Sequence, residues 1–486
     1  MSIAVKLSNL GPLRSAELEL SDLVLLIGEN NSGKTFLAAV LHRVLDTTSS
    51  RPWGRHRPPG DAPPLLRDWL TRVADDPDGA AAESDIGPPG LDDDTRAWAT
   101  EIAIEALTQY GSAVRDSIAY AFGAEASRLR RRTRSRHASD CYLRVRSSAP
   151  AWEVEIRFDS DRVTVTPPAA DAWLASALDP GRVRRAMRRF YPAGRGPSGL
   201  PARDLGRMLV AQGRPSMPGG LFASWPNHAV HLPADRTGVM QSHNVLAGAA
   251  VRQSARAGIR PIEIETLPGT LADFLSLILE LPETLARRGH PSRYDSVVQR
   301  FEQDIRAEIG VDKRSDGQDV IVARTSEGHF PMARSSSMLS ELAPLLLVLK
   351  SPFVYVDQLT IDEPEAHLHP EMQVRLASFL AELVNNGLRL VLTTHSDFFV
   401  TQFNNMMRLA ELSVSGDAPK SHDLPRLERS KVRALRFRRE NGWCTAHQSV
   451  PDALDGVDES TFTDVMRSQY DETARLVNEL IEVGIR

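Results

Sequence analysis

Short apolar runs set the pattern of this chain of 486 residues. Residues 23–27 read LVLLI, residues 359–361 read LTI and residues 388–392 read LRLVL, which is typical of strands buried in a parallel sheet. Residues 34–45 follow the first run with apolar positions at helical spacing, and they predict a helix. A strand that leads into a helix, with further strands later in the chain, indicates an α/β fold.

The remainder of the chain mixes helix, strand and loop. Residues 46–94 are rich in Pro, Gly and Asp and predict a loop with one short helix near residues 65–73. Residues 170–222 predict helix and loop. Further helices are predicted at residues 96–132, 270–288, 292–309, 342–349 and 461–485. Further strands are predicted at residues 142–145, 152–156, 162–165, 229–233, 320–323, 432–437 and 443–447.

A glycine-rich loop joins the first strand to the first helix. Residues 28–35 read GENNSGKT, which is the G-x-x-x-x-G-K-T pattern of the phosphate-binding loop in P-loop NTPases. Glycines let successive N–H groups turn toward phosphate oxygens, and the helix N-terminus adds partial positive charge. Lys34 is expected to reach the β- and γ-phosphates, and the Thr35 hydroxyl is expected to bind Mg²⁺. The expected nucleotide-binding residues are Gly28, Glu29, Asn30, Asn31, Ser32, Gly33, Lys34 and Thr35.

Two carboxylates and a histidine follow the later strands. Asp362 and Glu363 end the strand near residue 361, and His395 follows the strand that ends at residue 394. Asp362 suits the shell of a metal ion. Glu363, on the opposite side of an extended chain, can orient or deprotonate an attacking water. Asp-Glu-Pro also suits a helix N-terminus, and a histidine can be purely structural.

The order of these elements resembles the ABC-type ATPase head of SMC and RecF-like proteins. More narrowly, the stretches NLGPLRSAELELSDLVLLIGENNSGKT, IDEPEAHLHP and TTHSDFFV resemble the AAA15/AAA21 group of ABC-type ATPases. That group contains the OLD family and ATPase subunits of several bacterial anti-phage systems. The similarity covers residues 1–46 and 335–405 and is weaker at residues 232–237.

The resemblance implies a Mg²⁺-dependent ATPase with the fold of an ABC/SMC-type P-loop head around a mixed sheet. ATP and Mg²⁺ are its implied cofactors. Lys34 and Thr35 become ligands of phosphate and Mg²⁺, and Asp362 becomes the carboxylate on the Mg²⁺ side. Glu363 becomes the catalytic glutamate, and His395 becomes the switch histidine.

The resemblance also implies a discontinuous head. Residues 1–46 and 311–410 are expected to form it, and residues 47–310 are expected to form a large α+β insertion. Residues 411–486 are expected to form a C-terminal α+β extension. This tail is short, and its acids fall in one loop, so we expect no nuclease domain of the OLD type.

A serine-rich loop stands where ABC heads carry the signature Leu-Ser-Gly-Gly-Gln. Ser335, Ser336 and Ser337 precede an apolar helix and offer hydroxyls to a phosphate bound on a second head. The glycines of the signature are missing. Simple capping of the helix by these serines is the alternative interpretation. The resemblance implies a homodimer or a higher homo-oligomer formed through the heads.

Composition narrows the class of protein. The chain is 42% hydrophobic and 25% charged, with a net charge of −5, which is ordinary for a globular protein. Its two cysteines, Cys141 and Cys444, lie far apart and predict neither a disulfide scaffold nor a zinc site. We find no leader pattern and no membrane-length apolar run, so we expect a cytoplasmic protein.

Two arginine clusters are the strongest basic features of the chain. A nucleic-acid track, a docking surface for a protein and a solvated helix face are equally compatible with them. The first cluster comprises Arg128, Arg130, Arg131, Arg132, Arg134 and Arg136. The second comprises Arg182, Arg184, Arg185, Arg188 and Arg189.

Two functional hypotheses follow. The first is an ATPase motor or sensor that gates a separately encoded effector protein, as in bacterial anti-phage defence. The alternative is a DNA-binding repair ATPase of the RecF/SMC type. A transporter subunit is the weaker third idea, because the signature glycines are missing and the region between the motifs is large.

Overall fold

The computed structural model describes most of the chain. The described residues are 3–46, 63–75, 92–129, 140–160, 162–177, 221–222, 225–226, 228–242, 267–286, 291–313, 319–351, 356–414, 424–440, 442–458 and 460–482.

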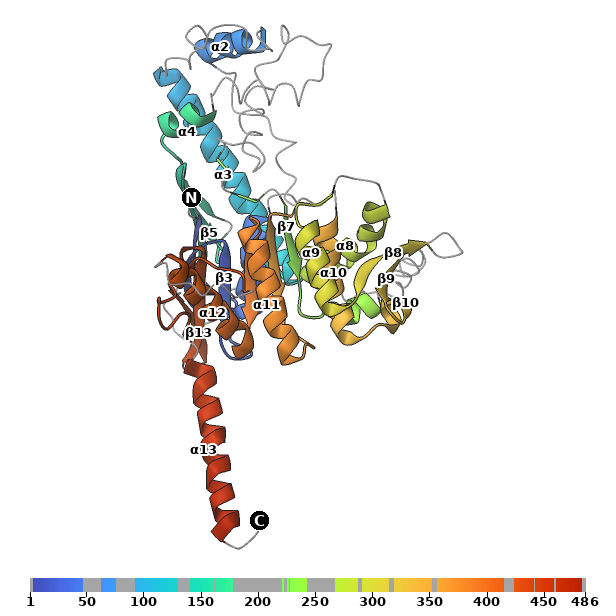
Figure 1. Cartoon of the computed structure of the whole chain (residues 1–486). Helices are drawn as coiled ribbons and strands as arrows, with labels where there is room; N and C mark the ends of the chain where they lie inside the picture. Colours follow the sequence, from blue (N-terminus) through green and yellow to red (C-terminus); the bar gives the residue numbers. More distant parts are fainter. Residues whose placement is uncertain are drawn as a thin grey trace, which may run out of the picture.

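One 11-stranded mixed sheet forms the centre of the described structure (Figure 1). Its order is β6-β5-β4-β1-β2-β14-β13-β3-β12-β11-β7. The strands β13, β3, β12, β11 and β7 run parallel to one another, whereas most other neighbours are antiparallel. The strands are β1 (Ile3–Leu10), β2 (Leu13–Glu19), β3 (Leu23–Ile27), β4 (Tyr142–Ser148), β5 (Ala151–Arg157), β6 (Val163–Thr166), β7 (Ala229–Leu232), β11 (Gln358–Asp362), β12 (Arg389–Thr394), β13 (Val432–Glu440) and β14 (Trp443–Ser449).

Helices cover both faces of this sheet and bury two separate hydrophobic cores. In β3, Val24 and Leu26 join the core that includes α1 (Lys34–Leu45) and α3 (Asp93–Ala121). Leu23, Leu25 and Ile27 join the core on the other face. The helices of that second core are α8 (Gly269–Ala286), α9 (Asp295–Ile305), α10 (Ser337–Lys350), α11 (Pro370–Asn385) and α12 (Asp397–Val414). Burial on both faces explains the unbroken apolar run of β3.

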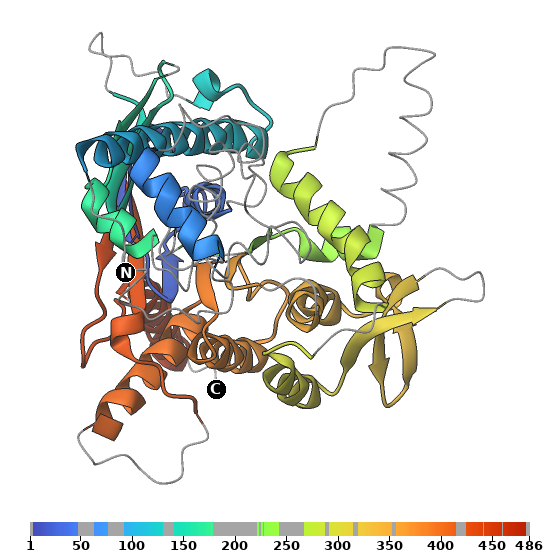
Figure 2. The ribbon, with the colours of Figure 1, turned by 90° about the horizontal axis from the view of Figure 1, so that it is seen from above.

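A second, 3-stranded sheet lies beyond the edge strand β7 (Figure 2). It contains β8 (Glu308–Lys313), β9 (Asp319–Thr325) and β10 (Gly328–Pro331), followed by the short 3₁₀ helix η3 (Met332–Arg334). The helix predicted at residues 292–309 is therefore too long. It ends at Ile305 because Arg306 adopts a left-handed conformation with φ 55°, after which β8 begins. The sequence predicted a strand at residues 320–323 and no further strand before the serine-rich loop, but β10 follows β9 there.

The remaining described elements lie at the periphery. Figure 1 shows α13 (Ser460–Glu482) extending away from the sheet. The others are α2 (Pro64–Asp75), η2 (Ala126–Leu129), α4 (Ala170–Ala177) and η4 (Arg429–Lys431). No helix among the described residues is long and apolar enough to cross a membrane.

The division into head, insertion and extension stays a prediction. Strands from all three predicted parts share the central sheet. The strands β4 to β7 come from residues 47–310, and β13 and β14 come from residues 411–486. The strand β13 pairs directly with β3, so the C-terminal part contributes to the middle of the sheet and not only to its edge.

Truncation of a core side chain in β3 should destabilise the whole sheet. Leu25 is 0% exposed, and we expect Leu25→Ala to lower the free energy of unfolding by about 2–5 kcal/mol because it leaves a cavity. Leu454 is 81% exposed, and Leu454→Ala is the matched control, with an expected change within about 0.5 kcal/mol. Chemical denaturation measures both. Equal effects of the two substitutions would contradict the assignment of β3 to the core.

Candidate active site

The glycine-rich loop lies between β3 and α1, as its sequence predicts. Gly33 has φ 93°, and a Cβ atom there would lie 2.9 Å from Leu13 Cδ2, so a side chain is excluded on both grounds. The loop turns sharply at this point and lets α1 begin at Lys34.

The Lys34 side chain lies against the backbone of the glycine-rich loop. Its Nζ donates hydrogen bonds to the carbonyl oxygens of Gly28 and Glu29, both at 2.7 Å. Burial lowers the pKa of Lys34, and the nearby carboxylates of Glu363 and Glu365 oppose this shift. The lysine charge and these carboxylates therefore share one site, although they come from distant parts of the sequence.

The loop offers the groups that a phosphate requires. The N-terminus of α1 has no side-chain cap and no acidic residue in its first turn, so its N–H groups remain available to an anion. The Ser32 hydroxyl is buried and has no hydrogen-bond partner among the described residues. Thr35 is exposed at the start of the helix. These residues fit a nucleotide phosphate and its Mg²⁺.

Strand register brings the carboxylates to the same edge of the sheet. Ile27 pairs with Thr394 across β3 and β12, and Thr393 pairs with Asp362 across β12 and β11. The three parallel strands therefore end at one level, where open α/β sheets bind ligands.

Asp362 is completely buried and is held on both oxygens. Its Oδ1 accepts a hydrogen bond from the Thr393 hydroxyl at 3.1 Å. Its Oδ2 lies 2.9 Å from His231 Nε2 of β7. Neighbouring side chains from β12 and β7 therefore hold both oxygens of this carboxylate.

Glu363 departs from the extended conformation that the sequence predicts. Its φ is 46°, in the left-handed region. Its N–H donates hydrogen bonds to the Thr393 carbonyl oxygen at 3.1 Å and to the Thr393 hydroxyl at 3.0 Å, which hold this conformation. The carboxyl group is partly exposed. His395 Nδ1 lies 3.7 Å from the nearest oxygen of Glu363, so these two predicted site residues stand side by side.

Glu365 joins the site although the sequence interpretation did not single it out. It accepts hydrogen bonds from the Thr394 hydroxyl at 2.7 Å and from the His395 N–H at 3.0 Å. Burial raises the pKa of Glu365. Glu365 lies in the stretch IDEPEAHLHP, two residues after Glu363. This short spacing was the sequence feature that could have identified it as a site residue.

A buried arginine links the end of β11 to α10. The Arg236 guanidinium donates to the carbonyl oxygens of Asp362 at 2.6 Å and Glu363 at 3.0 Å, and it is ion-paired with Glu341. Thr237 Oγ1 donates to the other oxygen of Glu341 at 2.7 Å. The Arg236 and Glu341 side chains are 2% and 1% exposed, so the charges compensate each other away from water.

The serine-rich loop caps α10. Ser336 is the N-cap, and its hydroxyl accepts from the Leu339 N–H at 3.3 Å. The Ser335 hydroxyl donates to the Pro331 carbonyl at 3.2 Å, whereas Ser337 is exposed. The capping interpretation is thus satisfied by Ser336, and a role as a signature loop in trans stays a prediction.

Most of the first arginine cluster lies outside the described residues. Arg128 is described, is exposed and lies 3.7 Å from Glu125. Arg130, Arg131, Arg132, Arg134 and Arg136 lie outside, as does the second cluster, so both stay untested. Cys141 and Cys444 are buried, and no disulfide joins them. No cluster of three or more acidic, histidine or cysteine side chains suited to a metal occurs in the described part.

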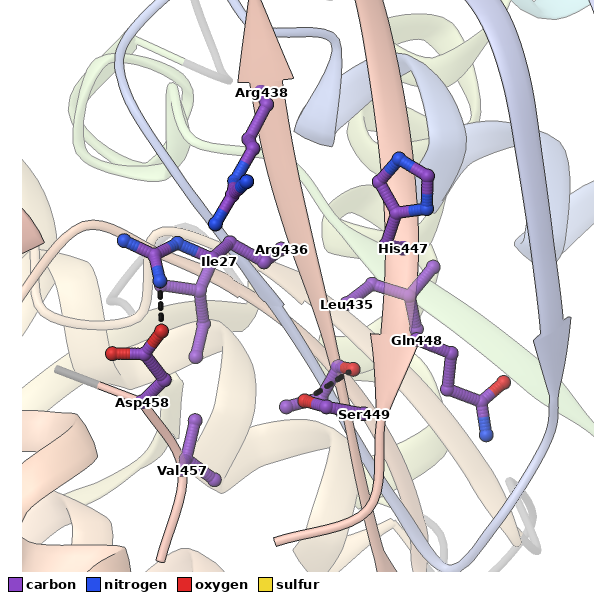
Figure 3. A pocket seen from close by; sticks show the side chains of 10 residues that line it. Ile27, Leu435, Arg436, Arg438, His447, Gln448, Ser449, Val457 and Asp458 are labelled. Atoms are coloured by element: carbon purple, nitrogen blue, oxygen red, sulfur yellow. Dashed lines mark hydrogen bonds and ion pairs between the residues drawn. The ribbon is translucent and has the colours of Figure 1, made fainter. Parts of the chain in front are cut away.

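A pocket of ≈ 280 Å³ lies between β13, β14 and the end of β3 (Figure 3). Ile27 and Ala434 line it, and both belong to the core opposite α1, so the pocket lies on the other face of the sheet from the helix that follows the loop. Arg436 is ion-paired with Asp458 on one wall.

Breaking the buried ion pair should cost far more than breaking an exposed one. We expect Glu341→Leu to destabilise the protein by about 3–5 kcal/mol, because it leaves the Arg236 charge buried and unpaired. Adding Arg236→Met should recover part of that loss. Glu17→Leu at the exposed Lys6–Glu17 pair (2.6 Å) is the control, with an expected change within about 1 kcal/mol. Thermal or chemical unfolding of the wild type and the three variants tests this. A double variant no more stable than Glu341→Leu would contradict it.

Comparison with known proteins supports an ATPase. Residues 270–400 match the family model described as an AAA ATPase domain. This range contains α10, β11 and β12, and with them Glu341, Asp362 and His395. No curated protein matches the chain in sequence.

Three solved SMC heads are similar to the chain. An SMC head bound to the C-winged helix domain of ScpA is 9% identical with a TM-score of 0.37, and the match covers 92% of this chain and 97% of that one. The SMC head domain from Thermotoga maritima is 11% identical with a TM-score of 0.34, covering 92% and 99%. An Smc head with an extended coiled coil, bound to the C-terminal domain of ScpA derived from Pyrococcus furiosus, is 9% identical with a TM-score of 0.35, covering 97% and 98%.

The chain's own topology agrees with the matched family. The strand β3, the glycine-rich loop and α1 meet two further parallel strands, β11, which ends at Asp362, and β12, in one mixed sheet. Residues 270–400 therefore carry an AAA ATPase domain, and the chain is an ATPase.

Proposed function

We propose that the chain binds ATP with Mg²⁺ between the loop at residues 28–35 and the ends of β11 and β12, and that it hydrolyses the γ-phosphate. The observation that carries this proposal is the strand register, which brings Lys34 to the carboxylates of Asp362 and Glu363. The loop N–H groups and Lys34 bind phosphate oxygens. Thr35 and Asp362 hold the metal, which neutralises charge on the phosphates when bound.

Glu363 is the proposed general base. Its partly exposed carboxyl leaves room for a water molecule, whereas Asp362 is fully enclosed. The left-handed turn at Glu363 directs its carboxyl away from the strand, and the Thr393 and Arg236 hydrogen bonds hold that turn. His395 stands beside Glu363 and donates to the γ-phosphate or to the attacking water.

Removal of the lysine charge should abolish nucleotide binding. Lys34→Ala loses the ammonium group that binds the phosphates, while the fold is retained because the lysine contributes charge and little packing. Calorimetry with ATP measures the binding, and circular dichroism checks the fold. Affinity close to wild type in the variant would show that the loop is not the nucleotide site.

Substitutions at the two adjacent acids should separate catalysis from metal binding. Glu363→Gln should retain ATP binding and slow hydrolysis by roughly 10²–10⁴-fold, because the base is lost. Asp362→Asn should instead weaken Mg²⁺-dependent binding. Steady-state phosphate release and calorimetry measure the two effects. If Glu363→Gln lost binding but kept its turnover per bound ATP, the glutamate would have a structural role.

We further propose that ATP brings two heads together and that this assembly gates a separately encoded effector in anti-phage defence. The resemblance of the three site segments to ATPase subunits of such systems supports the defence role. The exposed Ser337 at the start of α10 supports contact with a nucleotide on a second copy.

The hydrolysis-deficient Glu363→Gln protein offers a test of gating. With ATP it should form a dimer or higher oligomer in size-exclusion chromatography, and it should retain a co-expressed product of a neighbouring gene. Lys34→Ala is the control that cannot load. If the ATP-loaded protein instead binds DNA, with an affinity that falls steeply with salt, the RecF/SMC-type alternative replaces the gating proposal.

A further inference from the structure

Two buried histidines lie behind Asp362 on the sheet face that α1 covers. His231 comes from β7 and His42 from α1, and their side chains belong to residues that are 8% and 5% exposed. The ring centroids are 5.3 Å apart. Neither histidine belongs to the motifs that the sequence singles out, and the proposed hydrolysis does not use them.

The hydrogen bond between His231 and Asp362 has a fixed direction. A carboxylate oxygen without a hydrogen only accepts, so His231 Nε2 is assigned as the donor across the 2.9 Å to Asp362 Oδ2. The opposite ring nitrogen, Nδ1, is buried without a partner among the described residues. A hydrogen on Nδ1 would be a buried donor without a partner, so we assign the donor hydrogen of the bond to Nε2.

Asp362 is therefore clamped from both neighbouring strands. The Thr393 hydroxyl of β12 holds Oδ1, and His231 of β7 holds Oδ2. These bonds fix both torsions of the carboxylate, which would otherwise rotate within its site. Partners of this kind fix the orientation of metal-binding groups, and their loss typically reduces metal affinity or activity by about 10–100-fold.

We propose that His231 is a positioning residue that holds the Asp362 carboxylate in the orientation required by the Mg²⁺ of the bound nucleotide. The inference rests on the proposed function, because it needs Asp362 on the metal side. His231 does not touch nucleotide or metal itself. Its effect is on the Mg²⁺ concentration at which ATP binds, and not on the affinity of the loop for ATP without metal.

His42 provides the matched control. The His42 ring is about as buried as the His231 ring and lies next to it, yet no hydrogen bond joins His42 to Asp362. Burial together with the neighbouring His231 lowers the pKa of His42 to about 3, so the His42 ring is neutral and adds no charge to the site. Substitution of His42 disturbs packing around the pair but leaves the clamp on Asp362 in place.

The test measures ATP binding by calorimetry against Mg²⁺ concentration, with Glu363→Gln in every protein to suppress hydrolysis. His231→Leu should raise the Mg²⁺ concentration for half-maximal binding by about 10–100-fold. His231→Gln, whose amide N–H has a similar reach to Nε2, should remain near the reference. Binding of ATP in EDTA should be the same in all variants. If His231→Leu does not fold, His231→Asn serves instead, because its shorter amide cannot reach Asp362.

Three outcomes would overturn the inference. They are an unshifted Mg²⁺ midpoint in His231→Leu, an equal shift in His42→Leu, and a loss of ATP binding in EDTA, which would mean general damage to the site. A reference protein without any Mg²⁺-dependent ATP binding would instead refute the proposed function, so the two failures are distinguishable.

Discussion

Parallel pairing of β3, β12 and β11 is the constraint on which the site depends. The phosphate-binding loop and the carboxylates are separated by most of the chain, and they meet only because the three strands end at the same level. All three strands are buried on both faces. A slip by one residue would exchange their inner and outer side chains in both cores at once, so packing enforces the register. The packing of the two hydrophobic cores therefore determines the geometry of the site.

The carboxylates are positioned by polar groups that the cores enclose. Arg236 donates to the carbonyl oxygens of Asp362 and Glu363 and pairs with Glu341 of α10. The guanidinium cannot leave one partner without exposing a charge to a dry environment. The Arg236 side chain therefore links α10, which follows the serine-rich loop, to the turn at Glu363. A displacement of α10 either carries that turn along or breaks the pair.

The parts of this site that could be predicted are those that short, contiguous sequence motifs specify. The GENNSGKT loop, the β3 run and the acids at the end of β11 each combine a short motif with an apolar strand, so their placement needed no long-range information. His231 and Arg236 were missed as site-forming residues because their partners lie 131 and 126 positions away. The left-handed turn at Glu363 was missed for the same reason, since the Thr393 contacts that hold it come from another strand. The break at Arg306 was missed because nothing in the local helical pattern marks it.

The edge strand β7 has more influence on the site than its length implies. It has four residues, and among the described strands it pairs with β11 alone. Yet it supplies His231 to Asp362, and the turn after it supplies Arg236 to both acids. These polar contacts hold the edge strand against β11, and they also hold the acids in place. A displacement of β7 therefore acts directly on Asp362 and Glu363, because His231 contacts Asp362 and Arg236 contacts both residues.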